Sequence, residues 1–501
     1  MTIDMQSDTA REAELLRRRG EAAATLRAGI GEETVAAHRR LLEFDPAQPD
    51  AWFNLAYVLR HLARPEEALQ AYAAALDYGV ARPEEARLNR AAILSDQLLD
   101  LDAALIELDL ALRANPRFGL AWFNMGGLHE DRGDEIAAVS TYRTLLALEP
   151  NHARALGRLA ELARAADDRR AVLVELDERL AAPNLGDDDK AELLFAQART
   201  LERLAHFDAA FDSAREANTV AGNLAARAGW RYDAFARAAT VDRIIAAPSS
   251  SDEIAYNGSA PLFICGMFRS GSTVLEHVLS AHPALCAGGE IEALPRLVAE
   301  QLPRYPDGLA TLTAVELAAM RDIYRAQASR AACGERIVID KRPDNFLYLG
   351  LAKRLFPDAR VLITRRHPLD VILSNLFLRF DDSVSYSFKL ESVAHWLVQE
   401  RRLARHWSLT YPGSVVEVDY DRLVIDPRGV IEETLQFVGL EWDDICLRFH
   451  ERGAAIRTPS GWQARRPLHA GSSGRWRHYR GQLAPAVAIL RAGGVEVEGW
   501  D

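Results

Sequence analysis

The sequence predicts two folds in one chain, an all-helical repeat region followed by an α/β domain built on a parallel sheet. Two observations lead to this prediction. From about residue 21 to 245 the sequence is rich in Ala, Leu, Arg and Glu, is broken mainly at Pro and Gly, and repeats motifs every 34–35 residues. After residue 261, short apolar runs alternate with amphipathic segments, which is the pattern of parallel strands joined by crossover helices.

The length and composition agree with several domains. A chain of 501 residues is too long for one ordinary core, and its 49% apolar residues can fill more than one. The net charge of −12 argues against general nucleic-acid binding. The N-terminus lacks the apolar segment of a signal peptide, and no run reaches the roughly 18 apolar residues of a membrane span. We therefore expect a cytoplasmic protein without a membrane span.

The domain boundaries follow from shifts in composition. We predict an N-terminal tail or first helix over 1–20, helical repeats over 21–245, a linker over 246–260 and the α/β domain over 261–501. The linker is rich in small and polar residues. The four cysteines are scattered and lack metal-ligand spacing, so we expect buried free thiols, with neither a disulfide framework nor a zinc site, at Cys265, Cys286, Cys333 and Cys446.

The repeat unit is visible in several kinds of residue. Pro116 and Pro150 lie 34 residues apart, and the four residues AWFN begin two helices, at 51 and at 121. Asn54, Asn89 and Asn124 follow one another at intervals of 35 residues. In the second helices, small residues recur where paired helices must approach, and tyrosines take matching positions four residues after two of them: Ala68, Ala104 and Ala138; Tyr72 and Tyr142.

This pattern resembles tetratricopeptide repeats over about residues 34–160, with one more divergent helix pair at 193–218. Such repeats stack into a solenoid with a concave groove. We expect the groove to bind a peptide or a protein partner. The alternatives are a spacer and a support for a homodimer.

The α/β domain begins with a candidate anion site. A strand over 262–265 leads through Gly266, four residues and Gly271 into a helix, which is the spacing of a phosphate-binding loop. Ser272 replaces the usual lysine of that loop, and Arg269 supplies a cation at another place. Backbone N–H groups and the helix start still favour an anion, while the missing lysine argues against a nucleoside triphosphate. A structural connector is the alternative.

A second anion site is predicted at neighbouring strand ends. Lys341 follows a strand that begins near residue 336, and Arg366 follows a strand over 360–364. Ser374 lies in the next helix, where its hydroxyl can face the same anion. A further strand is predicted over 414–427, before a helix over 428–438. Ligands of parallel sheets bind beyond the carboxyl ends of the strands, so the two sites together favour a ligand phosphorylated at two places. Taken singly, Arg366 is equally well explained as a surface residue.

These residues resemble the sulfotransferase family, in particular the tyrosylprotein sulfotransferases, over about residues 258–480. The motifs are FRSGST, AHPALCAGGE, IDKRP and ITRRHPLDVILSN. The resemblance implies 3′-phosphoadenosine 5′-phosphosulfate (PAPS) as donor, without a metal. It places Arg366 and Ser374 at the 3′-phosphate and a run of five residues around the 5′-phosphosulfate: Arg269, Ser270, Gly271, Ser272 and Thr273.

The resemblance also implies catalytic roles. Glu290 matches the general base, Lys341 the lysine that stabilises the transferring group, and Tyr420 a tyrosine near the nucleotide. A solvated carboxylate, a surface lysine and a core tyrosine are the respective alternatives.

The segment 457–480 contains six arginines and no acidic residue. It resembles the loop that closes over the nucleotide, with Ser460 at a transition-state serine and Arg475 at a lysine near the 3′-phosphate. A nucleic-acid patch is the alternative.

Departures from the family concern the acceptor more than the donor. Gly289 replaces the first acidic residue of the tyrosylprotein motif, and Leu378 stands where an arginine is expected. We expect transfer of a sulfuryl group to an acceptor hydroxyl, with protein tyrosine, sugar, lipid and small metabolite left open. A phosphate-loop kinase and a repeat scaffold with a non-catalytic nucleotide-binding domain are the alternative functions.

Overall fold

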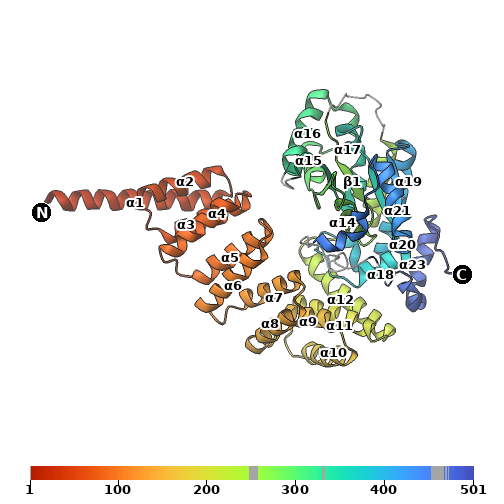
Figure 1. Ribbon diagram of the computed structural model, residues 1–501, viewed down its shortest axis with the longest axis horizontal. Coiled ribbons are helices and arrows are strands. Elements are labelled where there is room, and N and C mark those ends of the chain that lie inside the picture. The colour runs from red at the N-terminus through yellow and green to blue at the C-terminus, as the bar shows by residue number, and fades with distance from the viewer. Residues whose placement is uncertain (1, 248–257, 330–332, 453–467, 469–470, 472) are drawn as a thin grey trace. The chain divides into compact units, whose positions relative to one another are not determined.

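The computed structural model describes residues 2–247, 258–329, 333–452, 468, 471 and 473–501. The chain divides into two compact units, Met1–Arg164 and Ala165–Asp501 (Figure 1). Helices fill the first unit, and the second combines further helices with a five-stranded parallel sheet. The expected fold class, helical repeats followed by a parallel-sheet domain, is confirmed.

The first unit consists of helices, most of them paired. Several helices begin with Pro in the first turn, where its missing N–H costs nothing, and α6 and α8 begin at aspartates whose side chains accept backbone N–H groups. The helices are α1 (Thr2–Ala28), α2 (Glu32–Phe44), α3 (Pro49–His61), α4 (Pro65–Asp77), α5 (Pro83–Asp96), α6 (Leu101–Ala114), α7 (Gly119–Arg132), α8 (Glu135–Leu148) and α9 (Ala153–Leu162).

The repeating positions pack as the spacing predicts. Ala68, Ala104 and Ala138 are fully buried between helices, and Tyr72 and Tyr142 are buried one turn later. The repeated tryptophans serve the same packing role, because the indole N–H groups of Trp52 and Trp122 donate to the Pro46 and Pro116 carbonyls at 2.9 and 3.0 Å. Small residues let the helices approach, while the tryptophans tie each helix to the preceding turn.

The second unit begins with four helices that precede the sheet. These are α10 (Ala166–Leu180), α11 (Asp187–Arg203), α12 (Phe207–Arg227) and α13 (Ala234–Ala246). The remaining α-helices are α14 (Ser272–Ser280), α15 (Ala293–Gln301), α16 (Ala314–Ala328), α17 (Leu349–Leu355), α18 (Pro368–Leu376), α19 (Leu390–Thr410), α20 (Tyr420–Ile425), α21 (Pro427–Val438) and α23 (Arg480–Ala492). Short 3-10 helices are η1 (Leu309–Thr311), η3 (Pro343–Leu347), η4 (Ser385–Phe388), η5 (Asp444–Arg452) and η7 (Arg475–Tyr479).

The sheet has the strand order β2-β3-β1-β4-β5, and all neighbouring pairs are parallel. Its strands are β1 (Leu262–Cys265), β2 (Leu285–Ala287), β3 (Ile337–Asp340), β4 (Val361–Arg365) and β5 (Val415–Asp419). Because β1 lies between β3 and β4, the loops that follow these three strands meet at one edge.

Helices cover both faces of the sheet (Figure 1). In β1, Phe263 and Cys265 point into the core shared with α16 to α19, while Leu262 and Ile264 point into the core shared with α14, α20 and α21. Burial on both faces explains why β1 reads as a continuous apolar run rather than an alternating one.

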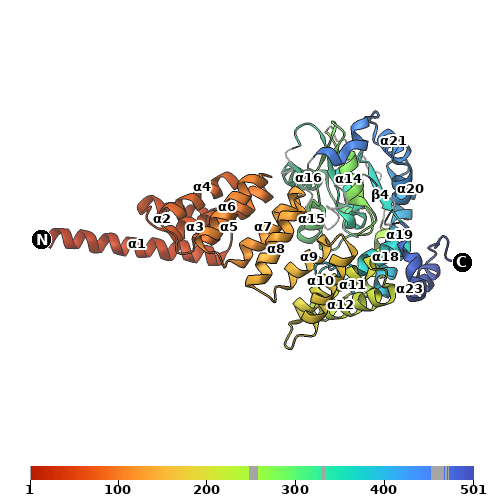
Figure 2. The ribbon, with the colours of Figure 1, turned by 60° about the horizontal axis from the view of Figure 1, so that its bottom comes forward.

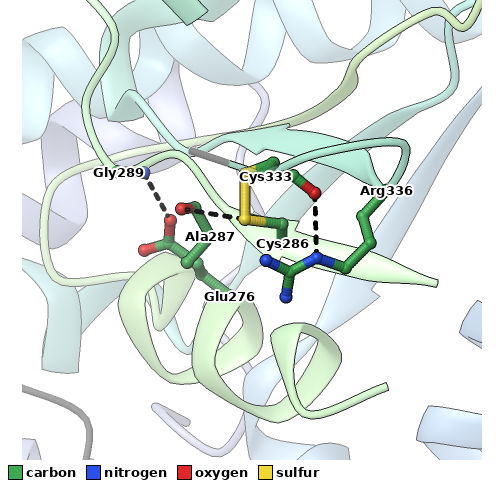
Figure 3. Close-up of a disulfide and its surroundings, with 6 residues drawn as sticks. All are labelled: Glu276, Cys286, Ala287, Gly289, Cys333 and Arg336. Atoms are coloured by element: carbon green, nitrogen blue, oxygen red, sulfur yellow. Dashed lines mark hydrogen bonds between the residues drawn. A yellow bond between two sulfur atoms is a disulfide. The ribbon is translucent and has the colours of Figure 1, made fainter. Parts of the chain in front are cut away.

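Two local predictions are wrong, and one strand was missed. The strand predicted over 414–427 ends at Asp419, because the Asp419 side chain accepts the Arg422 backbone N–H and starts α20. Strand β2 was not predicted. Cys286 in β2 and Cys333 are joined by a disulfide, whereas Cys265 and Cys446 are buried free thiols as expected (Figure 3).

The disulfide joins residues 47 positions apart. Cys286 pairs with Val338 of β3 across the β2–β3 ladder, and Cys333 lies just before β3, so the parallel pairing brings the two cysteines together. This proximity exists only in the folded sheet, which is why the spacing along the sequence did not reveal it.

Candidate active site

The loop between β1 and α14 depends on two glycines with positive φ. Gly266 has φ +140°, and a Cβ there would stand 2.6 Å from the Thr364 carbonyl oxygen. Gly271 has φ +105°, and a Cβ there would stand 2.4 Å from the Tyr420 ring. Any side chain at either position would collide, so the loop can lie against β4 and Tyr420 only with glycine.

Hydrogen bonds fix the same loop from beneath. The buried Ser270 hydroxyl donates to the Met267 carbonyl at 2.6 Å and contacts the Thr364 hydroxyl at 2.6 Å. Ser272 and Thr273 follow in the buried first turn of α14. The N–H groups of a first helical turn have no intrahelical acceptors, and they favour an anion at this point.

Arg269 of the loop lies in contact with both Arg366 and Ser374. The Arg269 Nε donates to the Ser374 hydroxyl at 2.9 Å, and an Arg366 N–H donates to the Arg269 carbonyl at 3.3 Å. The Arg366 guanidinium lies over the Tyr420 ring, 5.1 Å from its centre. Arg269 itself has φ +74°, a strained conformation for a residue with a side chain.

The charges of these arginines are crowded. Burial, followed by the neighbouring Arg366 and Arg475, lowers the pKa of Arg269 to about 10. Arg269 remains protonated at neutral pH, so the cluster holds several positive charges partly shielded from water. A bound anion relieves this repulsion, which makes the cluster suited to a phosphate or a phosphosulfate.

Glu290 and Lys341 form an ion pair at the carboxyl end of β3. The Lys341 side chain is 1% exposed and its Nζ donates to Glu290 Oε1 at 2.6 Å, while the Glu290 side chain is 39% exposed. The backbone joins the two residues as well, because the Lys341 N–H donates to the Gly289 carbonyl. A buried lysine thus holds a carboxylate that solvent and ligands can still reach.

A buried carboxylate that the sequence reasoning missed supports this pair. Glu276 of α14 accepts the Gly289 N–H at 2.9 Å, directly before Glu290 (Figure 3). Burial raises the pKa of Glu276 to about 7, and nearby Lys341 opposes the rise. Burial likewise raises the pKa of Asp340 to about 7, although Tyr324 and Asn345 donate to its oxygens. An acidic residue on an otherwise apolar face of α14 was the available signal for Glu276.

The segment that carries Arg475 is tied to two helices. On one side, the buried Asp370 of α18 accepts the N–H groups of Gly474 and Trp476 at 2.6 and 2.9 Å. On the other side, Arg475 forms an ion pair with Glu202 of α11. Neither Asp370 nor Glu202 was identified from the sequence. Ser460 lies outside the described residues.

The structure therefore brings together ten of the described candidate residues in two groups. The first is the loop from Arg269 to Thr273 with Arg366, Ser374 and Tyr420, and the second, beside it, is the Glu290–Lys341 pair. Among the described residues, no helix has the length and apolar character to cross a bilayer. Within the same described segments, no cluster of three or more His, Cys, Asp or Glu side chains is placed to hold a metal ion.

Comparisons with known proteins show similarity to two families. Residues 261–444 match the model of the sulfotransferase family, and residues 39–70 match a tetratricopeptide repeat. An uncharacterised protein of Aquifex aeolicus is 28% identical over 339 residues, which cover 64% of this chain and 44% of that protein. Protein-tyrosine sulfotransferase 1 of Danio rerio is 26% identical over 209 residues, 39% of this chain and 58% of that enzyme.

This chain thus spans about half the length of these two relatives. Among solved structures, the sulfotransferase domain of the Synechococcus PCC 7002 olefin synthase aligns with 49% of this chain and 98% of its own, at 22% identity and a TM-score of 0.37. The part of the chain that carries the sheet is thus similar to the sulfotransferase family, and the helical part is similar to tetratricopeptide repeats.

Proposed function

We propose that the second unit transfers a sulfuryl group from PAPS to the hydroxyl of an acceptor. The observation that carries the proposal is the buried Lys341 bonded to Glu290 beside a loop that gathers positive charge. The match of residues 261–444 to the sulfotransferase family supports a transferase. The first group of residues offers cations to the phosphates of PAPS, and the second offers a carboxylate to the acceptor proton.

The residues present fit PAPS at both ends. The glycine loop and the start of α14 offer backbone N–H groups to a 5′-phosphosulfate, and Arg269 adds a cation at the same place. Arg366, Ser374 and Arg475 lie near Arg269 and are the proposed contacts of the 3′-phosphate. Tyr420, under the Arg366 guanidinium, holds that arginine in place.

The proposed chemistry follows from the Glu290–Lys341 pair. Bound PAPS supplies a sulfuryl group, and adenosine 3′,5′-bisphosphate leaves as the acceptor oxygen bonds to sulfur. Glu290 accepts the hydroxyl proton as that bond forms. Lys341 stabilises the negative charge on the transferring group and on the leaving phosphate oxygen, and it is preorganised for this because burial holds it in place. Ser460 stays a proposed contributor by resemblance alone.

A tyrosine side chain of a protein is the first acceptor to test, because the relative from Danio rerio is named a protein-tyrosine sulfotransferase. We propose that the tetratricopeptide repeats bind a protein partner, which would bring an acceptor protein to the enzyme. The other acceptors named above are alternatives in the same assay.

We propose a cytoplasmic location from the sequence, but the disulfide argues against it. The Cys286–Cys333 disulfide is of a kind that persists in oxidising compartments. Alkylation of the protein in intact cells, followed by mass spectrometry of these two cysteines, tests the location: free thiols support the cytoplasm, and an intact disulfide supports an oxidising compartment.

The test of the reaction is Glu290→Gln. The amide keeps the size of the side chain but cannot accept a proton, so we expect transfer from PAPS to tyrosine peptides and phenols to fall below detection while adenosine 3′,5′-bisphosphate binds nearly as before. Glu292→Gln is the matched control, because the Glu292 side chain is 77% exposed and its 3.3 Å ion pair is with Arg342 rather than with Lys341. Loss of nucleotide binding together with retained turnover in Glu290→Gln would contradict the assignment of Glu290 as the general base.

A further inference from the structure

We propose that Glu202 is a positioning residue for the 3′-phosphate of the donor, and that it acts by fixing the guanidinium of Arg475. Glu202 lies in α11, more than fifty residues before the sheet begins, in the helical part of the second unit. The inference rests on the proposed function, because it assigns a specificity role within the same donor site.

Two contacts hold the Arg475 side chain, and a third holds its partner Glu202. Its Nε donates to Glu202 Oε1, and the Tyr479 hydroxyl donates to the same oxygen at 2.9 Å. Its guanidinium lies over the Phe377 ring, 4.6 Å from the ring centre. The Arg475 and Glu202 side chains are only 23% and 18% exposed, so the ion pair is largely shielded from solvent.

These contacts determine which part of Arg475 a ligand can use. Glu202 occupies the Nε position and the Phe377 ring covers one face of the guanidinium, so we infer that a phosphate binds through the terminal nitrogens. Two parallel N–H groups match two oxygens of one phosphate. The positive charge of Arg475 reaches Arg269, since it contributes to the lowered pKa there. Glu202 therefore directs the arginine toward the anion cluster.

Helices α11 and α12 also hold α18, the helix that carries the proposed 3′-phosphate contact Ser374. Arg199 of α11 donates to the Phe377 carbonyl at 3.2 Å, and Asn218 of α12 donates to the Leu376 carbonyl at 2.7 Å. These carbonyls stand at the end of α18, the helix that carries Ser374. Both views show α12 beside α18 (Figures 1 and 2).

Aromatic rings also join α12 to the segment that carries Arg475. Phe207 of α12 stacks on His478 with the ring centres 4.1 Å apart, and it meets Tyr479 edge-on. The residues on both sides of the proposed 3′-phosphate contact thus rest on α11 and α12. These helices are in consequence part of the donor site and not only part of a repeat array.

The charge of Glu202 makes this role testable. A carboxylate close to a phosphate site repels the phosphate, so a role in balancing charge and a role in positioning predict opposite results. If Glu202 positions Arg475, its geometry matters and its charge does not. If Glu202 only balances charge, removing the charge strengthens phosphate binding and shortening the side chain changes little.

The experiment compares adenosine 3′,5′-bisphosphate with adenosine 5′-monophosphate, which differs only in the missing 3′-phosphate, by calorimetric titration of the full chain. Glu202→Asp keeps the charge but withdraws the carboxylate by one methylene, and we expect the affinity ratio of the two nucleotides to fall about tenfold, the worth of one charge-assisted hydrogen bond. Glu202→Gln keeps an acceptor oxygen in place, and we expect it to preserve most of the ratio.

Asp208→Asn is the matched control. Asp208 lies at the start of α12 and accepts a hydrogen bond from Gln482 at 2.6 Å. Its replacement removes one negative charge without changing the partner of Arg475, so we expect an unchanged affinity ratio of the two nucleotides. In an Arg475→Ala background, Glu202→Asp should have no further effect, because the two residues act as one unit.

The outcomes separate this inference from the proposed function. A ratio unchanged in Glu202→Asp, or raised in Glu202→Gln, would overturn the positioning role even if the wild-type protein binds the bisphosphate. Failure of the wild-type protein to prefer the bisphosphate would instead overturn the proposed donor. A merely structural role of Glu202 would lower both affinities together and leave their ratio unchanged, which also contradicts the inference.

Discussion

Replacement of Arg269 by methionine should stabilise the free protein and at the same time weaken donor binding. The reason is the crowding of positive charge in the anion site. Burial and the neighbouring arginines lower the pKa of Arg269 from 12.5 to about 10. A pKa below its unfolded value means that the protonated form is disfavoured in the fold, and at neutral pH Arg269 carries that cost in full.

The size of the effect follows from the shift. A change from 12.5 to about 10 corresponds to about 3 kcal/mol against folding. The hydrogen bond from Arg269 to Ser374 returns about 1 kcal/mol. Methionine removes both contributions, so the free energy of unfolding should rise by roughly 1–2 kcal/mol, seen as an increase of about 2–4 °C in the thermal midpoint. The strain of the positive φ is the same in both proteins.

Donor binding should change in the opposite direction. Arg269 offers a charged donor to the 5′ end of the nucleotide, and its loss should weaken adenosine 3′,5′-bisphosphate binding by roughly 10- to 150-fold. Thermal unfolding without ligand and calorimetric titration measure the two effects. Arg296→Met is the control, because Arg296 forms an exposed pair with Glu300 and should change neither quantity. A lowered midpoint combined with unchanged affinity would refute the reasoning.

The remaining predictions concern other parts of the molecule. Glu276→Gln should raise the thermal midpoint more at pH 8 than at pH 5, because a pKa raised from 4.5 to about 7 means that the wild-type protein loses stability as the pH rises through this interval; an equal effect at both pH values would contradict the buried charge. Serine at both Cys286 and Cys333 should lower the free energy of unfolding by about 2–4 kcal/mol, measured by denaturant titration, since the disulfide closes a 47-residue separation. Glu130→Ala should lower the midpoint of the first unit more than Tyr142→Phe does, because the alanine leaves both the buried Tyr142 hydroxyl and Arg158 without their acceptor, while phenylalanine removes only the hydroxyl; an equal or smaller loss in Glu130→Ala would contradict this reasoning.

Features encoded by short stretches of sequence could be predicted. The bounds of β1 agree with the apolar run Leu262–Cys265, and the repeat spacing identified buried alanines such as Ala68. The phosphate-loop spacing located Arg269, and the strand-end rule placed Arg366 and Ser374 at the same edge, where they now lie in contact. In each case a local pattern, of period or of position after a strand, carried the information.

Features that depend on contacts between distant segments could not be predicted. Glu202 and Arg475 are 273 residues apart, and nothing near either residue indicates the other. The Cys286–Cys333 disulfide depends on a parallel pairing of strands, of which β2, with three residues, was too short to recognise. Asp370 looked like an ordinary residue of a first helical turn, yet it holds the segment around Arg475.

The most direct test of the central claim is calorimetric titration of the full chain with adenosine 3′,5′-bisphosphate and with ADP, first without and then with magnesium. A donor site built from Arg269, Arg366, Ser374 and Arg475 predicts tight binding of the bisphosphate that does not depend on the metal, and weak binding of ADP. Magnesium-dependent preference for ADP would contradict the account and would favour a phosphate-loop kinase instead.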